Sequence, residues 1–186
     1  MNSNSIALFL HIVGALGFFV ALGLEWTSLR EIQGSAFPEQ VRVWMGIMKS
    51  TTKLGIPSML ALVITGFYMV LTDVGWTPWI LVVLGAVVLA MALSMAVTRP
   101  RMAAIGQALA KERGTVSQSF RNLANNPVLW ISIQTRIAVA LGIIFLKIAQ
   151  PDLVWSLLVI VVAIVLGVIS ALPISRRAGA RQAPTD

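Results

Sequence analysis

The sequence predicts an all-α integral membrane protein, an antiparallel bundle of five transmembrane helices with an amphipathic helix on the cytoplasmic surface. Of the 186 residues, 58% are hydrophobic and 11% are charged, which is far from the balance of soluble domains. Five apolar stretches match the length at which an α-helix crosses a hydrocarbon core, and they cover residues 6–24, 54–71, 78–97, 128–146 and 153–172. The basic residues gather on alternate connections between these stretches, as in multi-pass membrane proteins.

The first stretch is expected to remain in the mature protein as a transmembrane helix. Residues 1–5 carry no basic residue, so the charged region that begins a signal peptide is missing. We expect one membrane domain over residues 1–175, because the connections leave no room for a soluble domain. The tail over residues 176–186 is rich in Ala, Arg and Pro, and it is predicted to be disordered and cytoplasmic.

A helix of another kind is predicted in the first connection, over residues 38–53. Pro38 can open this helix, and its apolar residues then form one stripe of Val41, Trp44, Met45 and Met48. The opposite face is polar and includes three basic residues predicted to bind anionic lipid, Arg42, Lys49 and Lys53. We expect this helix to lie along the inner leaflet until Gly55 and Pro57 turn or kink the chain into the second span.

The third connection carries weaker signals. Met102, Ile105 and Leu109 share a helical period, which Gly114 ends. The Asn-Asn-Pro sequence at residues 125–127 then introduces the fourth span.

The charge distribution predicts the orientation. The first and third connections and the C-terminal tail carry nearly all the basic residues, whereas the N-terminus and the second connection carry none. Positive charge is retained on the cytoplasmic side, so the N-terminus is expected outside and the C-terminus inside a bacterial cytoplasmic (inner) membrane. The net charge of +7 therefore reflects topology, and nucleic acid is not expected as a partner. Lys147 is the exception, at the outer end of the fourth span beside Asp152, where its stem can carry the ammonium to the interface.

Tryptophans support the same boundaries. Trp76, Trp79 and Trp155 fall at predicted outer ends of the spans, and Trp26 and Trp130 fall at inner ends. We interpret them as anchors at headgroup depth.

Function is expected at His11, the only histidine, which lies about 9 Å below the outer boundary of the first span. Gly14, Gly17 and Ala21 follow it, and these small residues let either a neighbouring backbone or a flat ligand approach closely. Three roles are open for the imidazole. It can form a hydrogen bond inside the bundle with Thr65 or Tyr68, act as an axial haem or metal ligand, or transfer protons.

Haem b is the cofactor hypothesis. His11 would supply one axial nitrogen, and Met69, at a similar depth, a weaker second donor. The predicted ligand-binding residues are His11, Met69, Tyr68 and Gly14. The chain has no cysteine, which excludes thiolate ligands and cysteine nucleophiles. No catalytic set is predicted, since Glu25 lies about 21 Å from His11 along the same helix.

Arg136 is a second unusual residue, because it lies several residues into the fourth span beside Gln134 and Thr135. A charge at this depth is costly unless it snorkels, pairs or meets water. Arg136 either snorkels to the inner interface or pairs with Glu25, and the predicted polar intramembrane cluster comprises Glu25, Arg136 and Gln134.

The Leu10-His11-Ile12 start of the first span, followed by Gly14-Ala15 and Gly17, resembles small integral membrane proteins of a functionally uncharacterised bacterial family. The Gly66-Phe67-Tyr68 sequence in the second span and Arg136 in a late span are similar to features of that family. The same start is more distantly similar to copper-resistance D-type membrane proteins and HemJ-type protoporphyrinogen oxidases, which implies haem or copper handling. The HemJ-type pattern has a histidine and a lysine near the start of the third span, where this chain has residues 76–81 without either. The resemblance therefore implies haem binding at His11 and not the oxidase activity.

Three classes of function follow. The first is a membrane protein that binds a small molecule or haem near His11 in the outer half of the bundle. The second is an accessory or assembly subunit that binds partner helices through the Gly14, Gly17 and Ala21 face, with a second copy or another membrane protein as partner. The third is a transporter of a small solute or metal, along a route that links His11, Thr65, Glu25 and Arg136. An enzyme that works alone ranks last.

Overall fold

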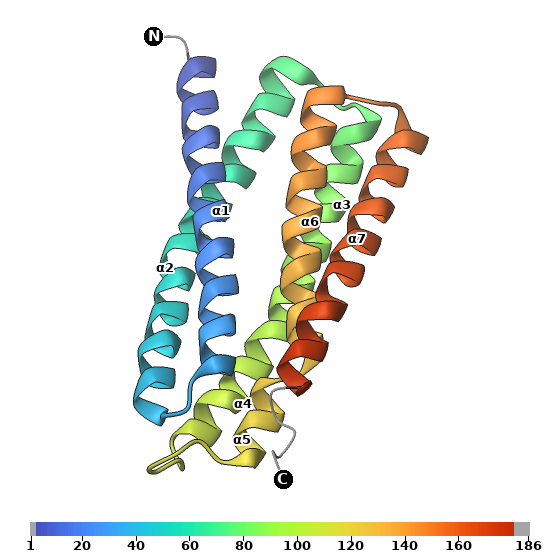
Figure 1. Ribbon diagram of the computed structural model, residues 1–186. Helices are drawn as coiled ribbons and strands as arrows, with labels where there is room; N and C mark the ends of the chain where they lie inside the picture. Colours follow the sequence, from blue (N-terminus) through green and yellow to red (C-terminus); the bar gives the residue numbers. More distant parts are fainter. Residues whose placement is uncertain (1–2, 181–186) are drawn as a thin grey trace. The chain divides into compact units, whose positions relative to one another are not determined.

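A computed structural model describes residues 3–180, and it describes side chains up to residue 172 (Figure 1). These residues are helical throughout apart from short connections, and no strand occurs among them. The elements in chain order are α1 (Ser3–Gly34), α2 (Pro38–Met69), the π-helical turn η1 (Val70–Val74), α3 (Pro78–Ala92), the π-helical turn η2 (Leu93–Thr98), α4 (Arg99–Leu109), α5 (Gln118–Ala124), α6 (Pro127–Ala149) and α7 (Leu153–Ala180).

Five helical stretches are long and apolar enough to cross a membrane, as the sequence predicts. They are Ser3–Gly34, Pro38–Val74, Pro78–Leu109, Gln118–Ala149 and Leu153–Leu172. The first four have 32, 37, 32 and 32 residues, and a 32-residue helix is about 48 Å long, so each exceeds the apolar stretch within it. The predicted membrane domain, residues 1–175, divides into two compact units. Unit 1 comprises Met1–Glu31 and Arg42–Thr77, and unit 2 comprises Ile32–Val41 and Pro78–Asp186.

Unit 1 is an antiparallel pair of helices, α1 and α2, which run side by side in Figure 1. Small residues bring the two backbones together. A Cβ atom on Gly14 would lie 3.0 Å from the Ser58 carbonyl oxygen, and one on Gly17 would collide with the Ser58 hydroxyl. A Cβ on Gly55 of α2 would in turn lie 3.4 Å from the Ala21 methyl group. Of the two uses that the sequence left open for the Gly14 face, the structure shows the approach of a neighbouring backbone.

The prediction of a separate interfacial helix over residues 38–53 is wrong. Helix α2 runs without interruption from Pro38 to Met69, with Pro57 inside it. A proline in a helix removes one backbone hydrogen bond, and its ring crowds the preceding turn. Helix α2 contacts α1 through Gly55 before this position and through Ser58 after it.

Unit 2 is built around the antiparallel hairpin of α6 and α7, against which α3 packs. Two glycines set the separation of the hairpin helices. A Cβ on Gly142 would lie 3.2 Å from that of Ala163, and a Cβ on Gly167 would lie only 2.6 Å from the Thr135 Cα atom. Helix α6 buries the most side chains, with Leu129, Ile133, Val139 and Leu146 fully covered.

The start of α6 confirms the signal read at residues 125–127. Asn126 precedes the helix, its side-chain oxygen accepts a hydrogen bond from the Val128 amide at 3.0 Å, and Pro127 occupies the first turn. At the other end of the chain, α7 is helical through Ala180, which includes the first five residues of the predicted tail. Residues 181–186 of that tail lie outside the described residues.

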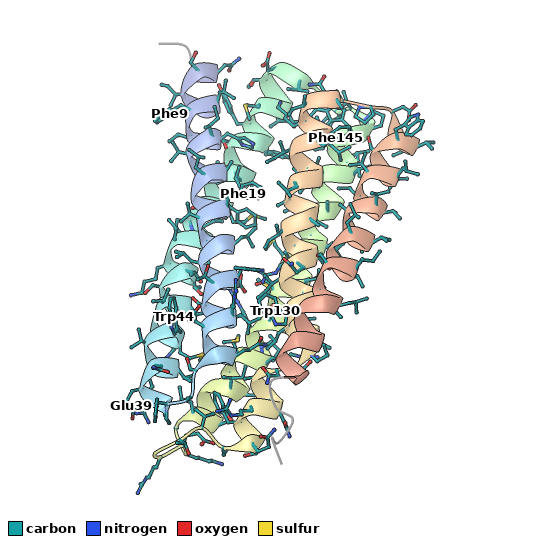
Figure 2. The ribbon with its side chains drawn as sticks, viewed as in Figure 1. Phe9, Phe19, Glu39, Trp44, Trp130 and Phe145 are labelled. Atoms are coloured by element: carbon teal, nitrogen blue, oxygen red, sulfur yellow. The ribbon has the colours of Figure 1, made fainter. Side chains whose placement is uncertain are left out.

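The turn between α1 and α2 is fastened within unit 2 by hydrogen bonds that the sequence did not indicate. The Gln33 amide donates to the Ala124 carbonyl at 2.8 Å and accepts from the Trp130 indole at 2.8 Å. The Val116 amide donates to the Ala36 carbonyl at 3.0 Å. Trp130 is 1% exposed, and Trp79, 7% exposed, is also buried, so the interpretation of these two as interfacial anchors is wrong. Figure 2 labels Trp130 near the start of α6. Trp76 and Trp155, in contrast, are largely exposed.

Gly167→Ala is expected to destabilise unit 2, because the added methyl group would meet the backbone of Thr135, which cannot rotate away. We expect a loss of about 1–3 kcal/mol, as for other overpacked sites, measured as a lower thermal unfolding midpoint of the detergent-purified protein. Gly85→Ala is the matched control, since a Cβ at Gly85 meets nothing within 4 Å. Equal midpoints for the two variants would contradict the close approach at Gly167.

Candidate functional site

His11 lies on α1 and faces Thr65 of α2. Its Nδ1 atom is 3.0 Å from the Thr65 hydroxyl oxygen, which confirms the predicted hydrogen bond within the bundle. Thr65 is buried, and its hydroxyl also donates to the Ala61 carbonyl of its own helix at 2.5 Å. The imidazole is therefore attached to a side chain that is itself held by the α2 backbone.

These two hydrogen bonds define the tautomer of the neutral imidazole. A threonine hydroxyl has one proton to donate, and that of Thr65 goes to Ala61. The Thr65 oxygen must then accept from His11, so Nδ1 carries the ring proton. The lone pair of the neutral ring consequently resides on Nε2. A histidine that ligates a metal commonly has this arrangement, with one nitrogen donating to a fixed acceptor and the other coordinating.

Gly66 makes room for the imidazole on α2. A Cβ atom at Gly66 would lie 3.3 Å from His11 Cε1 and 3.7 Å from Nδ1, so the ring packs directly against the helix backbone there. The sequence presented Gly66 only within the resemblance to a membrane protein family. Its contact with the ring depends on the pairing of α1 with α2, which the sequence does not specify.

The other residues predicted to bind the ligand are arranged differently. Gly14 faces Ser58 in the helix contact and not an open space. The Tyr68 hydroxyl lies 3.4 Å from the Asn4 side-chain oxygen, so Tyr68, the alternative partner predicted for His11, bonds elsewhere. Met69 is buried, one turn beyond Thr65 on the same face of α2. The structure thus brings together His11, Thr65 and Gly66.

The accessory-subunit hypothesis assigned the face of Gly14, Gly17 and Ala21 to partner helices. In unit 1 this face is covered by α2. A partner helix would have to bind elsewhere.

Arg136 lies in a buried polar network of unit 2. Its side chain is 6% exposed, so it does not snorkel to the surface. The guanidinium Nη2 donates to the Thr98 hydroxyl at 3.5 Å, and Thr98 lies 2.9 Å from the Ser132 hydroxyl. Ser132 also donates to the Leu93 carbonyl at 3.3 Å. Leu93 and Thr98 are the two ends of η2, so α6 supplies the partners for this widened turn.

Gln134 does not share this network. Residues two apart on an α-helix point about 200° from each other, and Gln134 accordingly lines a groove between α6 and α7. The predicted cluster of Glu25, Arg136 and Gln134 is therefore wrong for Gln134. Glu25 lies on α1 in unit 1, and its pairing with Arg136 stays a prediction.

The basic residues predicted to bind lipid, Arg42, Lys49 and Lys53, are all exposed on α2. They lie on one face of the helix, at spacings of seven and four. Because α2 is continuous, Arg42 is about 16 Å from Lys53 along the helix axis. Binding of anionic lipid by this row stays a prediction.

Among the described residues, no three or more His, Cys, Asp or Glu side chains are grouped so that they could hold a metal ion. A metal ion at His11 would therefore have no set of three such side chains among the described residues to hold it. Comparison of the chain with protein-family models, with curated protein sequences and with solved structures gives no match.

Thr98→Val should weaken unit 2 while leaving its shape nearly unchanged. The valine removes one acceptor of Arg136 and one partner of Ser132 in a buried site, at an expected cost of about 1–3 kcal/mol. The comparison is the thermal unfolding midpoint of Thr72→Val, in which the lost hydroxyl is exposed and bonds only the Tyr68 carbonyl. If both variants unfold at the same midpoint as the parent protein, the network does not contribute to stability.

Proposed function

We propose that this chain is a multi-pass protein of the bacterial cytoplasmic membrane that binds haem b through His11 near the outer end of α1. The observation that carries the proposal is the hydrogen bond from His11 Nδ1 to Thr65. A histidine that ligates a metal through Nε2 commonly donates its Nδ1 proton to a fixed acceptor in this way. With haem bound there, the protein would serve in electron transfer or in haem handling.

The surroundings of His11 support an apolar, flat ligand. Leu8 and Ile12 on α1 are 46% and 50% exposed, and Phe67 on α2 is 50% exposed, so the helices around the site present apolar surface. Gly14 and Gly17 hold α1 tightly against α2 one to two turns below, which leaves the ligand to approach from the outer side of the pair. Met69 stays the predicted second donor, and it would have to reach the face of the porphyrin opposite His11.

The first test is the visible spectrum of detergent-purified protein, oxidised and reduced, from cells supplied with haem. We expect a Soret band that His11→Ala removes. Thr65→Val should weaken haem binding by about 10–100-fold, the usual effect of removing the group that orients a ligating histidine. Thr65→Ser keeps the hydroxyl and should retain haem. A parent protein without a Soret band and without metal would refute the proposal.

Membrane orientation has its own test, because the chain contains no cysteine to interfere with labelling. Asp73→Cys and Arg42→Cys each place a single thiol at an exposed position. The two positions lie near opposite ends of the continuous helical stretch Pro38–Val74. With the N-terminus outside, a membrane-impermeant maleimide added to cells with a permeabilised outer membrane should label Asp73→Cys and spare Arg42→Cys. Inverted vesicles serve as the control and should give the reverse. Labelling of Arg42→Cys from outside would overturn the orientation.

A further inference from the structure

A groove of about 430 Å³ runs along the α6–α7 hairpin, within the size range of small-molecule sites. Its α6 side extends from Gln134 to Phe145, about 16 Å along the helix. Figure 2 labels Phe145 near the end of α6. The remaining lining is apolar apart from Ser170 of α7.

Among the described residues the groove has two polar side chains, and both lie at the same end of it. Gly167 of α7 packs against the backbone of Gln134, and Ser170 is one turn beyond Gly167. The Phe145 end is faced by Val159 and has no polar side chain. The groove therefore matches an amphiphile, because it has a short polar end and a long apolar part.

The side-chain amide of Gln134 has no hydrogen-bond partner among residues 3–172, and the side chain is half-buried in the groove. The Ser170 hydroxyl already donates to the Gly167 carbonyl at 2.9 Å, so it offers only an acceptor. In an apolar environment an unpaired amide is costly, so the site favours a ligand that presents a carbonyl or hydroxyl to Gln134.

The head of that ligand has to be uncharged. No Lys, Arg, Asp or Glu among the described residues lines the groove, so none of these side chains would compensate a carboxylate or a phosphate. With α6 inserted as proposed, Gln134 lies about 9 Å inside the hydrocarbon core, deeper than a phospholipid headgroup. A phospholipid that entered from the Phe145 end would place its terminal methyl group against the amide and leave it unpaired.

We propose that the α6–α7 groove binds an isoprenoid quinone, with a quinone carbonyl on the Gln134 amide and the tail running towards Phe145. The Gln134 N–H group donates to the quinone carbonyl. Its oxygen and that of Ser170 accept from the hydroxyl groups of the quinol. This inference rests on the membrane insertion in the proposed function, but not on haem.

The test is saturable binding of decylubiquinone to the full-length protein in phosphatidylcholine nanodiscs, measured against protein-free nanodiscs. We expect Gln134→Leu to weaken binding about tenfold, the effect of one lost hydrogen bond. Ala138→Phe, which fills the apolar part of the groove, should abolish binding. Gln107→Leu is the matched control, because Gln107 is exposed on α4, and it should bind as the parent does.

The outcomes separate the groove from the haem site. Unchanged binding in Gln134→Leu, or equal binding of a hydrocarbon of the same length, would overturn the quinone proposal. If Ala138→Phe fails to fold, Gln134→Leu, which loses no internal hydrogen bond, decides alone. Binding that depends on Gln134 in a protein without haem would support the quinone site and refute only the haem proposal. Release of the protein from membranes by carbonate would overturn both proposals.

Discussion

Close contact between helix backbones at small residues is the constraint on which each unit depends. In unit 1, Gly14 and Gly17 of α1 meet Ser58 of α2, and in unit 2, Gly167 of α7 meets Thr135 of α6. In a membrane, as proposed, lipid tails are as apolar as these side chains, so the hydrophobic effect would not hold the helices together and van der Waals contact and hydrogen bonds would have to do so. The register that these contacts impose places His11 over Gly66 and Thr65.

Hydroxyl groups are the second device shared by the two units. Thr65 gives its proton to Ala61 and accepts from His11, whereas Ser132 joins Thr98 to the Leu93 carbonyl at the π-helical turn η2. Thr65 thus joins the carbonyl of its own helix to α1, whereas Ser132 joins α6 to η2 at two points. In an apolar interior an unpaired polar group is costly, so such pairing makes buried polar side chains tolerable there. A positioned imidazole and a buried guanidinium both follow from it.

The periodicity of the sequence predicted features that belong to a single helix. It failed for the exposure and contacts of side chains, which depend on the neighbouring helix. The stripe of Val41 and Met48 was read as a membrane-facing surface, yet both residues are buried. Gly55 and Pro57 were expected to turn or kink the chain after a separate helix, yet α2 is one helix through both, with contacts to α1 on either side of Pro57. Gln134 and Arg136, two residues apart, were read as one polar cluster, yet the helical turn sends them to opposite faces. Gln33 and Trp130 gave no signal, because their hydrogen bond joins positions 97 residues apart.

The sequence by itself determined the helical class, the five apolar helices and the place of His11 on the first of them, since these follow from composition and from local periodicity. It also offered Thr65 and Tyr68 as partners of His11, and the structure shows Thr65. Only the tertiary structure decided that Gly66 lies under the imidazole, that Gly14 serves helix contact, and that Gln134 faces a groove with Ser170. These features depend on the rotation of each helix about its axis, which the contacts of both partners set together.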